Sequence, residues 1–289
     1  YTGQATNGNS GLHDILARFQ TTATNAHVCL TNSQVRFIAQ YDEASNHNGG
    51  EMHFGPDGYL YVALGDEGGS NGQYGNTQRI DLDYFSAIMR LDVNKLPGNL
   101  PPNPHVSLVS TTNYSIPADN PWVGATNFNG LTVNSNNVRT EFWAVGMRNP
   151  WRFNFDPANG NCYLGHVGQG SNEWINVLFT GANCGWNWFE GTTQRSNSLP
   201  AGFVYNCPPL FQYSHTNAPG TSTKRLCIIG GLVCRDSRWP NLNGAYIYCD
   251  YNTGEFWALR HNGTNVTQNQ LLFTDSSAHT SAFGVDPSN

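Results

Sequence analysis

Short strand signals separated by turn residues run along the whole sequence, and they limit what this chain can fold into. Nine segments are rich in β-branched and aromatic residues, and clusters of Gly, Asn, Asp and Pro separate them. They are 35–39, 59–64, 87–93, 141–145, 162–165, 175–179, 228–235, 244–248 and 255–259. The fair candidate for a helix is Ser10 to Phe19. Closely spaced strands of this kind predict an all-β sandwich, barrel or propeller.

A hairpin phrase, in which an aromatic strand end meets a tight Asp, Pro or Gly turn, recurs along the chain. Its copies are 54–62, 153–164 and 283–289. This recurrence fits every second or third blade of a propeller, whose blades have roughly 40–50 residues. The third copy stops inside its turn, so we expect a chain that lacks its C-terminal end. The Pro- and Asn-rich stretch at about 93–137 is expected to be a long ordered loop over one face of a single domain, 1–289.

The composition excludes several classes of function. Among 289 residues only 34 are charged, fewer than the 36 Asn, and the net charge is −6. So few cations argue against a nucleic-acid surface. No apolar run approaches the roughly 18 residues of a membrane span. The 36 aromatic residues argue against disorder and provide enough apolar mass for a core.

The cysteines and glycosylation sequons indicate an oxidising setting, extracellular or periplasmic. Seven cysteines are present without a C-x-x-C pair, which gives no support to a zinc ribbon or thioredoxin motif. The sequons are Asn113, Asn262 and Asn265, although chance alone produces such sequons at this Asn content. Because the chain starts at Tyr1 without a signal peptide, we expect a processed or incomplete chain. We predict disulfides between Cys207 and Cys227 and between Cys162 and Cys184.

Three loop segments carry residues suited to chemistry, each with a plainer alternative. His47, before a Gly pair, can project into a central cavity or be an ordinary surface histidine. Arg148, followed by Asn149 and Pro150, suits an anion or a carbonyl oxygen, or else binds loop carbonyls structurally. The turn 168–173 offers backbone carbonyls and one carboxylate, as hard cations prefer, or is an ordinary Gly turn. The Gly-rich acidic loop 65–72 lacks the lysine of a phosphate cradle.

In order along the chain, these segments resemble the soluble PQQ-dependent sugar dehydrogenases. That group includes soluble glucose dehydrogenase, aldose sugar dehydrogenases and the hedgehog-interacting-protein-like propellers. The matching segments are H-N-G-G at 47–50, F-G-P-D-G-Y-L-Y-V at 54–62, G-M-R-N-P at 146–150, V-G-Q at 167–169, G-A-N-C-G-W at 181–186, I-G-G-L-V at 229–233 and G-A-Y-I-Y-C-D-Y at 244–251. The resemblance implies a six-bladed β-propeller with the first and last blades incomplete and the site at one mouth of its channel.

The resemblance also implies roles for individual residues. His47 would be the general base that takes the C1 hydroxyl proton of an aldose as hydride moves to PQQ. Arg148 and Asn149 would contact the quinone, with Arg148 stabilising developing negative charge. The carbonyls of Gly168 and Gln169 would bind a Ca²⁺ that polarises PQQ, and Glu173 would lie in its outer shell. An external electron acceptor would then reoxidise the cofactor.

The sequence departs from the family where the cofactor carboxylates are held. The family's lysine falls near Asn252 and its arginine pair near 278–281, where His279 is the remaining candidate cation. PQQ has three carboxylates, so these losses should weaken its binding unless Arg225 or Arg235 substitutes. Where the family has an acidic residue next to the base, this sequence has Asn46. The pattern is nearer the hedgehog-interacting-like branch, and the alternative function is a cofactor-free extracellular propeller that binds a glycan or a protein partner.

Overall fold

The computed structural model describes residues 1–4 and 11–286, and within these ranges every regular element is a β-strand. The all-β class is therefore confirmed, and each of the nine expected segments contains or overlaps a strand. The helix expected at Ser10 to Phe19 is wrong. Ser10 lies outside the described residues and Gly11 precedes strand β2 (Leu12–Thr22). Residues 12–19 fall in this strand, whose first half packs Ile15 into the core against the neighbouring strand.

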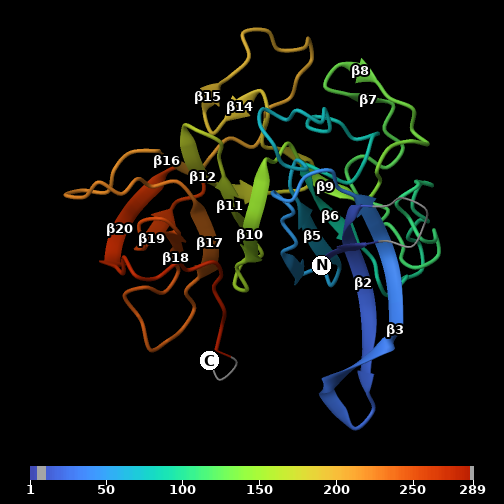
Figure 1. The fold of residues 1–289 in the computed structure, drawn as a ribbon, viewed down its shortest axis with the longest axis horizontal. Coiled ribbons are helices and arrows are strands. Elements are labelled where there is room, and N and C mark those ends of the chain that lie inside the picture. The colour runs from blue at the N-terminus through green and yellow to red at the C-terminus, as the bar shows by residue number, and fades with distance from the viewer. Residues whose placement is uncertain (5–10, 287–289) are drawn as a thin grey trace.

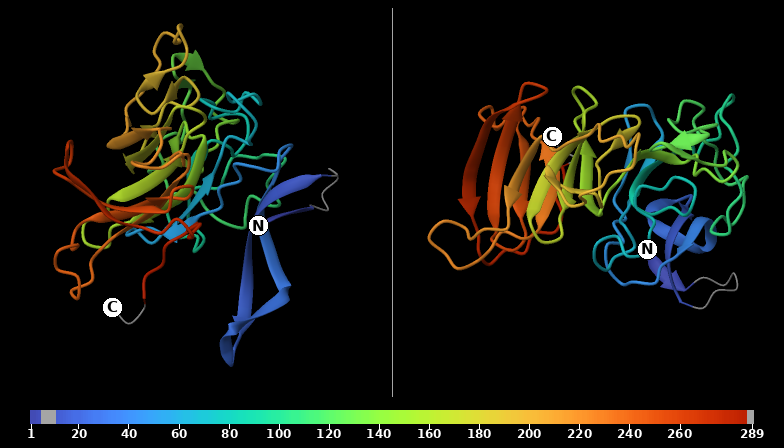
Figure 2. Two further views of the ribbon diagram at one scale, coloured as in Figure 1. Left: turned by 60° about the vertical axis from the view of Figure 1, so that its left-hand side comes forward. Right: turned by 90° about the horizontal axis from the view of Figure 1, so that it is seen from above.

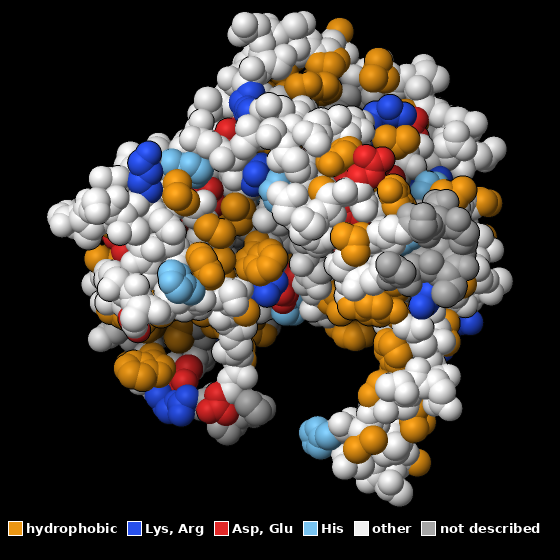
Figure 3. Space-filling model, in the orientation of Figure 1, with side chains coloured by type: hydrophobic (Ala, Val, Ile, Leu, Met, Phe, Trp, Pro, Cys, Tyr) orange, Lys and Arg blue, Asp and Glu red, His pale blue; other side chains and the backbone are white. Residues whose placement is uncertain are grey.

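The N-terminal sheet is a long hairpin that projects from the body of the protein (Figure 1). Strand β1 (Thr2–Gln4) pairs with β2, which pairs antiparallel with β3 (Asn25–Tyr41). Only the end of β3 near Tyr41 is buried, while its first eight residues are exposed. Figure 3 shows the hollow that separates this projecting arm from the other sheets.

Three larger sheets stand side by side and form the body (Figures 1 and 2). The first has the order β13-β9-β6-β5-β4, the second β10-β11-β12-β16 and the third β17-β18-β19-β20. Their pairings are antiparallel except β13 with β9. The bounds are β4 (Met52–Phe54), β5 (Leu60–Leu64), β6 (Ala87–Leu91), β9 (Phe142–Val145), β10 (Asn149–Phe155), β11 (Cys162–Val167), β12 (Asn172–Leu178), β13 (Ala182–Asn183), β16 (Phe211–Ser214), β17 (Ile228–Val233), β18 (Tyr246–Asp250), β19 (Glu255–His261) and β20 (Val266–Thr274).

Hydrophobic clusters fill the spaces between neighbouring sheets. One joins the first sheet to the hairpin, with Phe37 and Met89 among its buried residues. A second lies between the first and second sheets and contains Trp143 and Phe153. A third, around Tyr246, lies between the second and third sheets. Burying a side chain of this size contributes roughly 1.5–3 kcal/mol, so sheet-on-sheet packing holds the array together.

The long segment between β6 and β9 is mostly irregular and includes the short strands β7 (Asn127–Phe128) and β8 (Leu131–Thr132). Buried side chains attach it to the first sheet. The Tyr114 hydroxyl donates a hydrogen bond to Glu141 Oε1 at 2.7 Å. The Asn120 amide donates to the carbonyls of Arg90 and Thr140 at 3.0 and 2.8 Å. A second short pair, β14 (Phe189–Glu190) with β15 (Thr193–Gln194), follows the first sheet in the chain.

The cysteines contradict the two predicted disulfides. All seven fall in the described part of the chain and all are free thiols there. Cys162, Cys184 and Cys207 are buried together in the second hydrophobic cluster, where they pack as small apolar side chains. Cys227 packs against the third cluster, so the predicted pair Cys207–Cys227 is divided between two spaces in the core.

Candidate functional site

The residues of interest gather at one edge of the first two sheets, where strands end or begin. Asp66 follows β5, Arg148 precedes β10, and Gly168 follows β11. The chain runs close to itself here, because the Asp66 N–H donates to the Arg148 carbonyl at 2.8 Å. Gly65 has no room for a side chain, since a Cβ would collide with the carbonyl oxygens of His47 and Arg148. This close approach brings His47 to Arg148 from 101 residues away in the sequence (148 − 47).

His47 and Asp66 form a buried histidine–carboxylate pair. His47 Nδ1 lies 2.7 Å from Asp66 Oδ1, and the residues are 9% and 1% exposed. The Trp186 indole N–H donates to Asp66 Oδ2 at 2.7 Å, and the Gly68 N–H to Oδ1 at 3.2 Å. A carboxylate held in this way fixes the imidazole with its proton on Nδ1 and leaves Nε2 as an acceptor. Asp66 is therefore the acidic partner of His47, in place of the neighbour expected at Asn46.

The backbone of His47 is itself held in a sparsely populated conformation. Its φ is +63°, in the left-handed region that non-glycine residues seldom occupy. Such positions persist where surrounding contacts fix them, and they cluster at functional sites.

Arg148 is a buried cation beside this pair. Its Nη1 donates to the Gly168 carbonyl at 2.6 Å, and its guanidinium lies 5.8 Å from the Trp186 ring centroid. Burial lowers the pKa of Arg148, although the negative charges of Asp66 and Glu173 act to raise it. Its Nε has no hydrogen-bond partner among the described residues, and neither does the buried Oδ1 of the adjacent Asn149. A donor and an acceptor are thus left for a bound polar group.

A neutral histidine supports Arg148 from behind. His166 is fully buried in β11, and its Nε2 accepts the Arg148 backbone N–H at 2.8 Å. Burial lowers the pKa of His166 to about 3, so the ring stays neutral at physiological pH and keeps this acceptor.

Glu173 and Gly168 do not form the calcium site that the sequence suggests. Glu173 Oε1 accepts the Gly168 N–H at 3.1 Å and contacts His215 Nε2 at 2.8 Å, while Oε2 accepts an N–H from β17. Burial raises the pKa of Glu173 to about 7. The Gly168 carbonyl is occupied by Arg148. Over residues 1–4 and 11–286, no three His, Cys, Asp or Glu side chains are grouped so as to hold a metal ion. The Gly168 carbonyl and Glu173 are thus held by protein groups, whereas these contacts do not test the Gln169 carbonyl, the other expected calcium ligand.

A second carboxylate, Glu190, shapes the turn 169–172. Its Oε1 accepts the backbone N–H groups of Gln169, Gly170 and Ser171 at 2.9, 2.7 and 2.7 Å, and that of Asn172 at 3.3 Å. Burial acts to raise the pKa of Glu190, but these hydrogen bonds outweigh it and lower the pKa. The Gln169 side chain pairs with Asn71 through two hydrogen bonds of 2.7 and 3.0 Å, which ties this turn to the acidic loop of the first sheet.

Asn252 is at the same edge of the third sheet, in the turn between β18 and β19. Its amide donates to the Lys224 carbonyl at 2.7 Å, and among the described residues it makes no hydrogen bond with His47 or Arg148. The two candidate replacement cations are engaged elsewhere. Arg225 binds Glu255 at 2.6 and 2.7 Å, and Arg235 binds Asp156. Both arginines are therefore already ion-paired, and substitution of either for the missing lysine and arginine pair stays a prediction.

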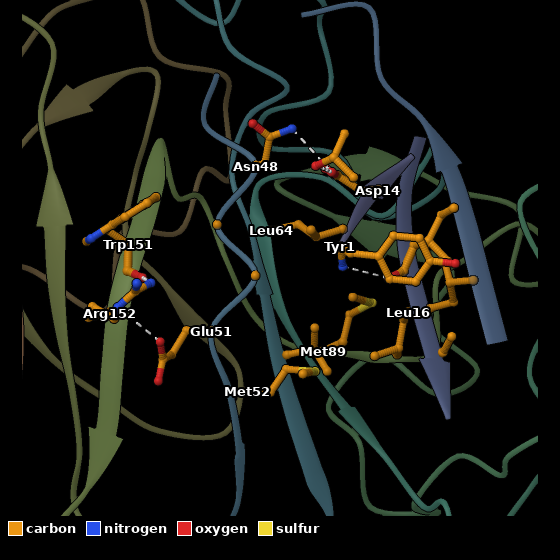
Figure 4. A pocket seen from close by; sticks show the side chains of 17 residues that line it. Tyr1, Asp14, Leu16, Asn48, Glu51, Met52, Leu64, Met89, Trp151 and Arg152 are labelled. Atoms are coloured by element: carbon orange, nitrogen blue, oxygen red, sulfur yellow. Dashed lines mark hydrogen bonds and ion pairs between the residues drawn. The ribbon is translucent and has the colours of Figure 1, made fainter. Parts of the chain in front are cut away.

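An apolar cavity of about 440 Å³ lies next to this edge, between β2 and the first sheet (Figure 4). Leu16, Leu64 and Met89 line one part, and the ion pair between Glu51 and Arg152 lines the opposite part, with Nε and Oε2 3.2 Å apart. Asn48 lines the cavity but the neighbouring His47 does not. The cavity therefore lies beside the histidine–carboxylate pair and is separate from it.

Sequence analysis assigns no role to three residues that build this site. Asp66 stands in the Gly-rich loop and Trp186 in a family motif. Glu190 stands in a segment without a recognised motif. The usable signal was the pair Gly65–Asp66, because a glycine before an acid at a strand end marks a close backbone approach.

These features define a class: an all-β protein of side-by-side antiparallel sheets with a histidine–carboxylate pair and a buried arginine at one sheet edge. A family model described as "Glucose / Sorbosone dehydrogenase" matches residues 1–279. The chain belongs to the glucose/sorbosone dehydrogenase family, which confirms the resemblance found in the sequence.

Individual relatives and solved structures agree with this assignment. The chain is 34% identical over 222 residues to the HIPL1 protein of Arabidopsis thaliana, which covers 74% of this chain and 30% of that protein. It is 27% identical over 258 residues to the human Hedgehog-interacting protein, covering 86% and 30%. The apo structure of the soluble aldose sugar dehydrogenase of Escherichia coli superimposes with a TM-score of 0.65 at 19% identity, covering 96% and 69%. The chain thus spans about a third of the length of these sequence relatives.

The fold of the solved neighbours is that of glucose dehydrogenases, which supports a propeller-like arrangement. Three blade-like sheets occur among the described residues, and the expected number of six is not tested by them. In the same residues no helix is long or apolar enough to cross a membrane.

Proposed function

We propose that this site oxidises an aldose at C1 and passes hydride to a bound pyrroloquinoline quinone. The observation that carries the proposal is the buried pair of His47 and Asp66 beside the unpartnered Nε of Arg148. His47 Nε2 accepts the proton of the C1 hydroxyl, and Asp66 stabilises the imidazolium that results. Trp186 keeps Asp66 in place through its indole N–H.

The cofactor, when bound, supplies the carbon–oxygen centre that receives the hydride. The residues present fit its quinone end: Arg148 Nε donates to an oxygen, and the buried guanidinium favours negative charge there. Asn149 lies next to it in the chain with a buried acceptor oxygen. Calcium has no role in this proposal, because the Gly168 carbonyl and Glu173 are already occupied by protein donors.

A second candidate function is a cofactor-free propeller that binds a glycan or a protein partner. One observation favours it: Arg225 and Arg235 are ion-paired and Asn252 is neutral, so the cofactor carboxylates lack their expected cations. The relatives named Hedgehog-interacting protein belong to the same family. In either case the sequons and the few charged residues support an extracellular or periplasmic location, whereas the seven free cysteines do not add to that support.

The test is reconstitution of the purified protein with the quinone, with and without Ca²⁺. Binding is followed by quenching of tryptophan fluorescence, and turnover by dye reduction with glucose and other aldoses. The proposal predicts saturable quenching and sugar-dependent dye reduction. Arg238→Ala is a matched control, because Arg238 is an exposed arginine paired with Asp236 away from the site. A parent protein that neither binds the quinone nor reduces dye would contradict the proposal and favour the cofactor-free binding function.

A further inference from the structure

Arg195 is a second guanidinium at the site, on the ring of the same tryptophan as Arg148. Its Cζ lies 4.7 Å from the Trp186 ring centroid. Nη2 donates to the Asn71 side-chain oxygen, and Nη1 is 3.7 Å from Glu190 Oε2. Trp186 in turn binds Asp66, so Arg195 is linked to His47 through only two residues. No family motif assigned a role to this position.

The hydrogen-bonding capacity of Arg195 is only partly used. Its Nη1 is buried and has no hydrogen-bond partner within the described residues, since 3.7 Å to Glu190 exceeds hydrogen-bond length. Glu190 Oε2 approaches Nη1 only at ion-pair distance, and the other oxygen, Oε1, accepts four backbone N–H groups. A guanidinium has five donors, so Arg195 retains capacity for an external acceptor.

An open cavity of about 390 Å³ adjoins this guanidinium. It is lined by Asn71, Asn187, Trp188, Arg195 and Ser196. This volume is within the range of small-molecule pockets, about 300–1,000 Å³. The Arg195 side chain is 23% exposed, so part of it is accessible from the cavity. Trp188 supplies an aromatic surface, and the two asparagines supply amide groups for hydroxyls.

We propose that Arg195 and this cavity form a carboxylate-binding subsite at the mouth of the His47 site, and that the ligand it takes is an acidic sugar such as a uronic acid. A neutral sugar offers the guanidinium no charged hydrogen-bond acceptor. A carboxylate offers two charged oxygens in one plane, which match the planar donors of the guanidinium. A carboxylate of the quinone has the same chemistry and is the other source that the experiment must distinguish. The inference rests on the proposed function for the identity of the main site.

Glucuronate and glucose are the discriminating probes, because they differ by a carboxylate in place of a hydroxymethyl group. Dissociation constants are measured by calorimetry for the parent protein, Arg195→Ala and Arg195→Lys, and quinone binding by fluorescence quenching. Arg238→Ala is the matched control, because Arg238 is an exposed arginine that pairs with Asp236 and does not line this cavity. Circular dichroism and the melting temperature show that each variant is folded.

The inference predicts that the parent binds glucuronate at least tenfold more tightly than glucose. Arg195→Ala should remove this preference, since a charged hydrogen bond is worth about 10- to 100-fold in affinity. Arg195→Lys should keep part of the preference, and Arg238→Ala should keep all of it. If Arg195→Ala instead weakens only quinone binding, the subsite holds a cofactor carboxylate.

Two results overturn the inference. One is equal affinity of the parent for glucuronate and glucose together with unchanged quinone binding in Arg195→Ala. The other is an equal loss of the glucuronate preference in Arg238→Ala. The proposed function is judged separately. Dye reduction with glucose that Arg195→Ala leaves unchanged supports the oxidation and rejects the subsite. Arg195-dependent glucuronate binding without dye reduction on any aldose supports the subsite and rejects the oxidation.

Discussion

Replacing Glu190 by glutamine should destabilise the protein without changing its shape. One oxygen of this buried carboxylate accepts three backbone N–H groups at 2.7–2.9 Å. A hydrogen bond to a charged acceptor contributes about 1.5–3 kcal/mol, and a neutral one about 0.5–1.5 kcal/mol. The difference is about 1–1.5 kcal/mol for each bond, so over three bonds the lost charge reduces the free energy of unfolding by about 3–4.5 kcal/mol. Glu190→Gln keeps the volume and one acceptor oxygen, so this difference isolates the charge.

The effect should depend on pH in a defined direction. The pKa of Glu190 is lowered in the folded state from its ordinary value of 4.5. Its stabilisation is therefore complete above pH 4.5 and is lost as the pH falls through the folded-state pKa. The parent and Glu190→Gln should differ by a constant amount between pH 6 and 8, and the difference should shrink in more acidic buffer.

Urea denaturation followed by tryptophan fluorescence measures this difference by linear extrapolation. Glu43→Gln is the control, because Glu43 is exposed and its substitution should change the free energy of unfolding by less than about 0.5 kcal/mol. The reasoning would be refuted by a Glu190→Gln protein that is as stable as the parent at pH 7. It would also be refuted by a difference in the free energy of unfolding that does not shrink in buffer more acidic than pH 4.5.

Three further predictions use single positions. Trp186→Phe removes the indole donor to Asp66 and should lower the rate of sugar oxidation about tenfold, measured by dye reduction at saturating sugar. Cys29 is exposed, and the other six free cysteines are more buried. A thiol reagent should therefore modify one cysteine quickly in the native protein and all seven after unfolding, and a slow reaction of the native protein would contradict this. In a eukaryotic secretory host Asn262 should carry an N-glycan and Asn113 should not, because Asn262 is exposed whereas the Asn113 amide donates to a backbone carbonyl at 2.8 Å; glycosidase treatment of N262Q and N113Q variants distinguishes them.

The strands were predictable because their signals are local. Segments such as 59–64 combine β-branched or aromatic residues with a Pro-Asp-Gly turn, and both are legible without tertiary structure. The stretch at Leu12 was misjudged because its pattern is short. Pairing with β3 decides its conformation, and pairing is a long-range property. The predicted disulfides are wrong for the same reason, since sequence spacing does not reveal that Cys207 and Cys227 pack in different clusters.

The candidate site was predictable only where a motif marks it. His47 and Arg148 stand in motifs, and the structure brings their backbones together through Gly65. Asp66 and Trp186 complete the hydrogen-bonded chain, and they lie 19 and 139 residues after His47 (66 − 47 and 186 − 47). Contacts between residues so far apart cannot be predicted from a single sequence. Glu190 ends the two-residue strand β14 and Arg195 follows the two-residue strand β15, and elements this short carry no periodic pattern.

The rate at which a sugar reduces the bound quinone in a single turnover tests the central claim most directly. The measurement compares the parent protein with His47→Ala, both loaded with the quinone and mixed rapidly with an aldose. Loss of a general base lowers such rates by about 10²–10⁴-fold, and that is the result expected for His47→Ala with quinone binding retained. Equal rates of quinone reduction in the two proteins would contradict the assignment of His47 as the base.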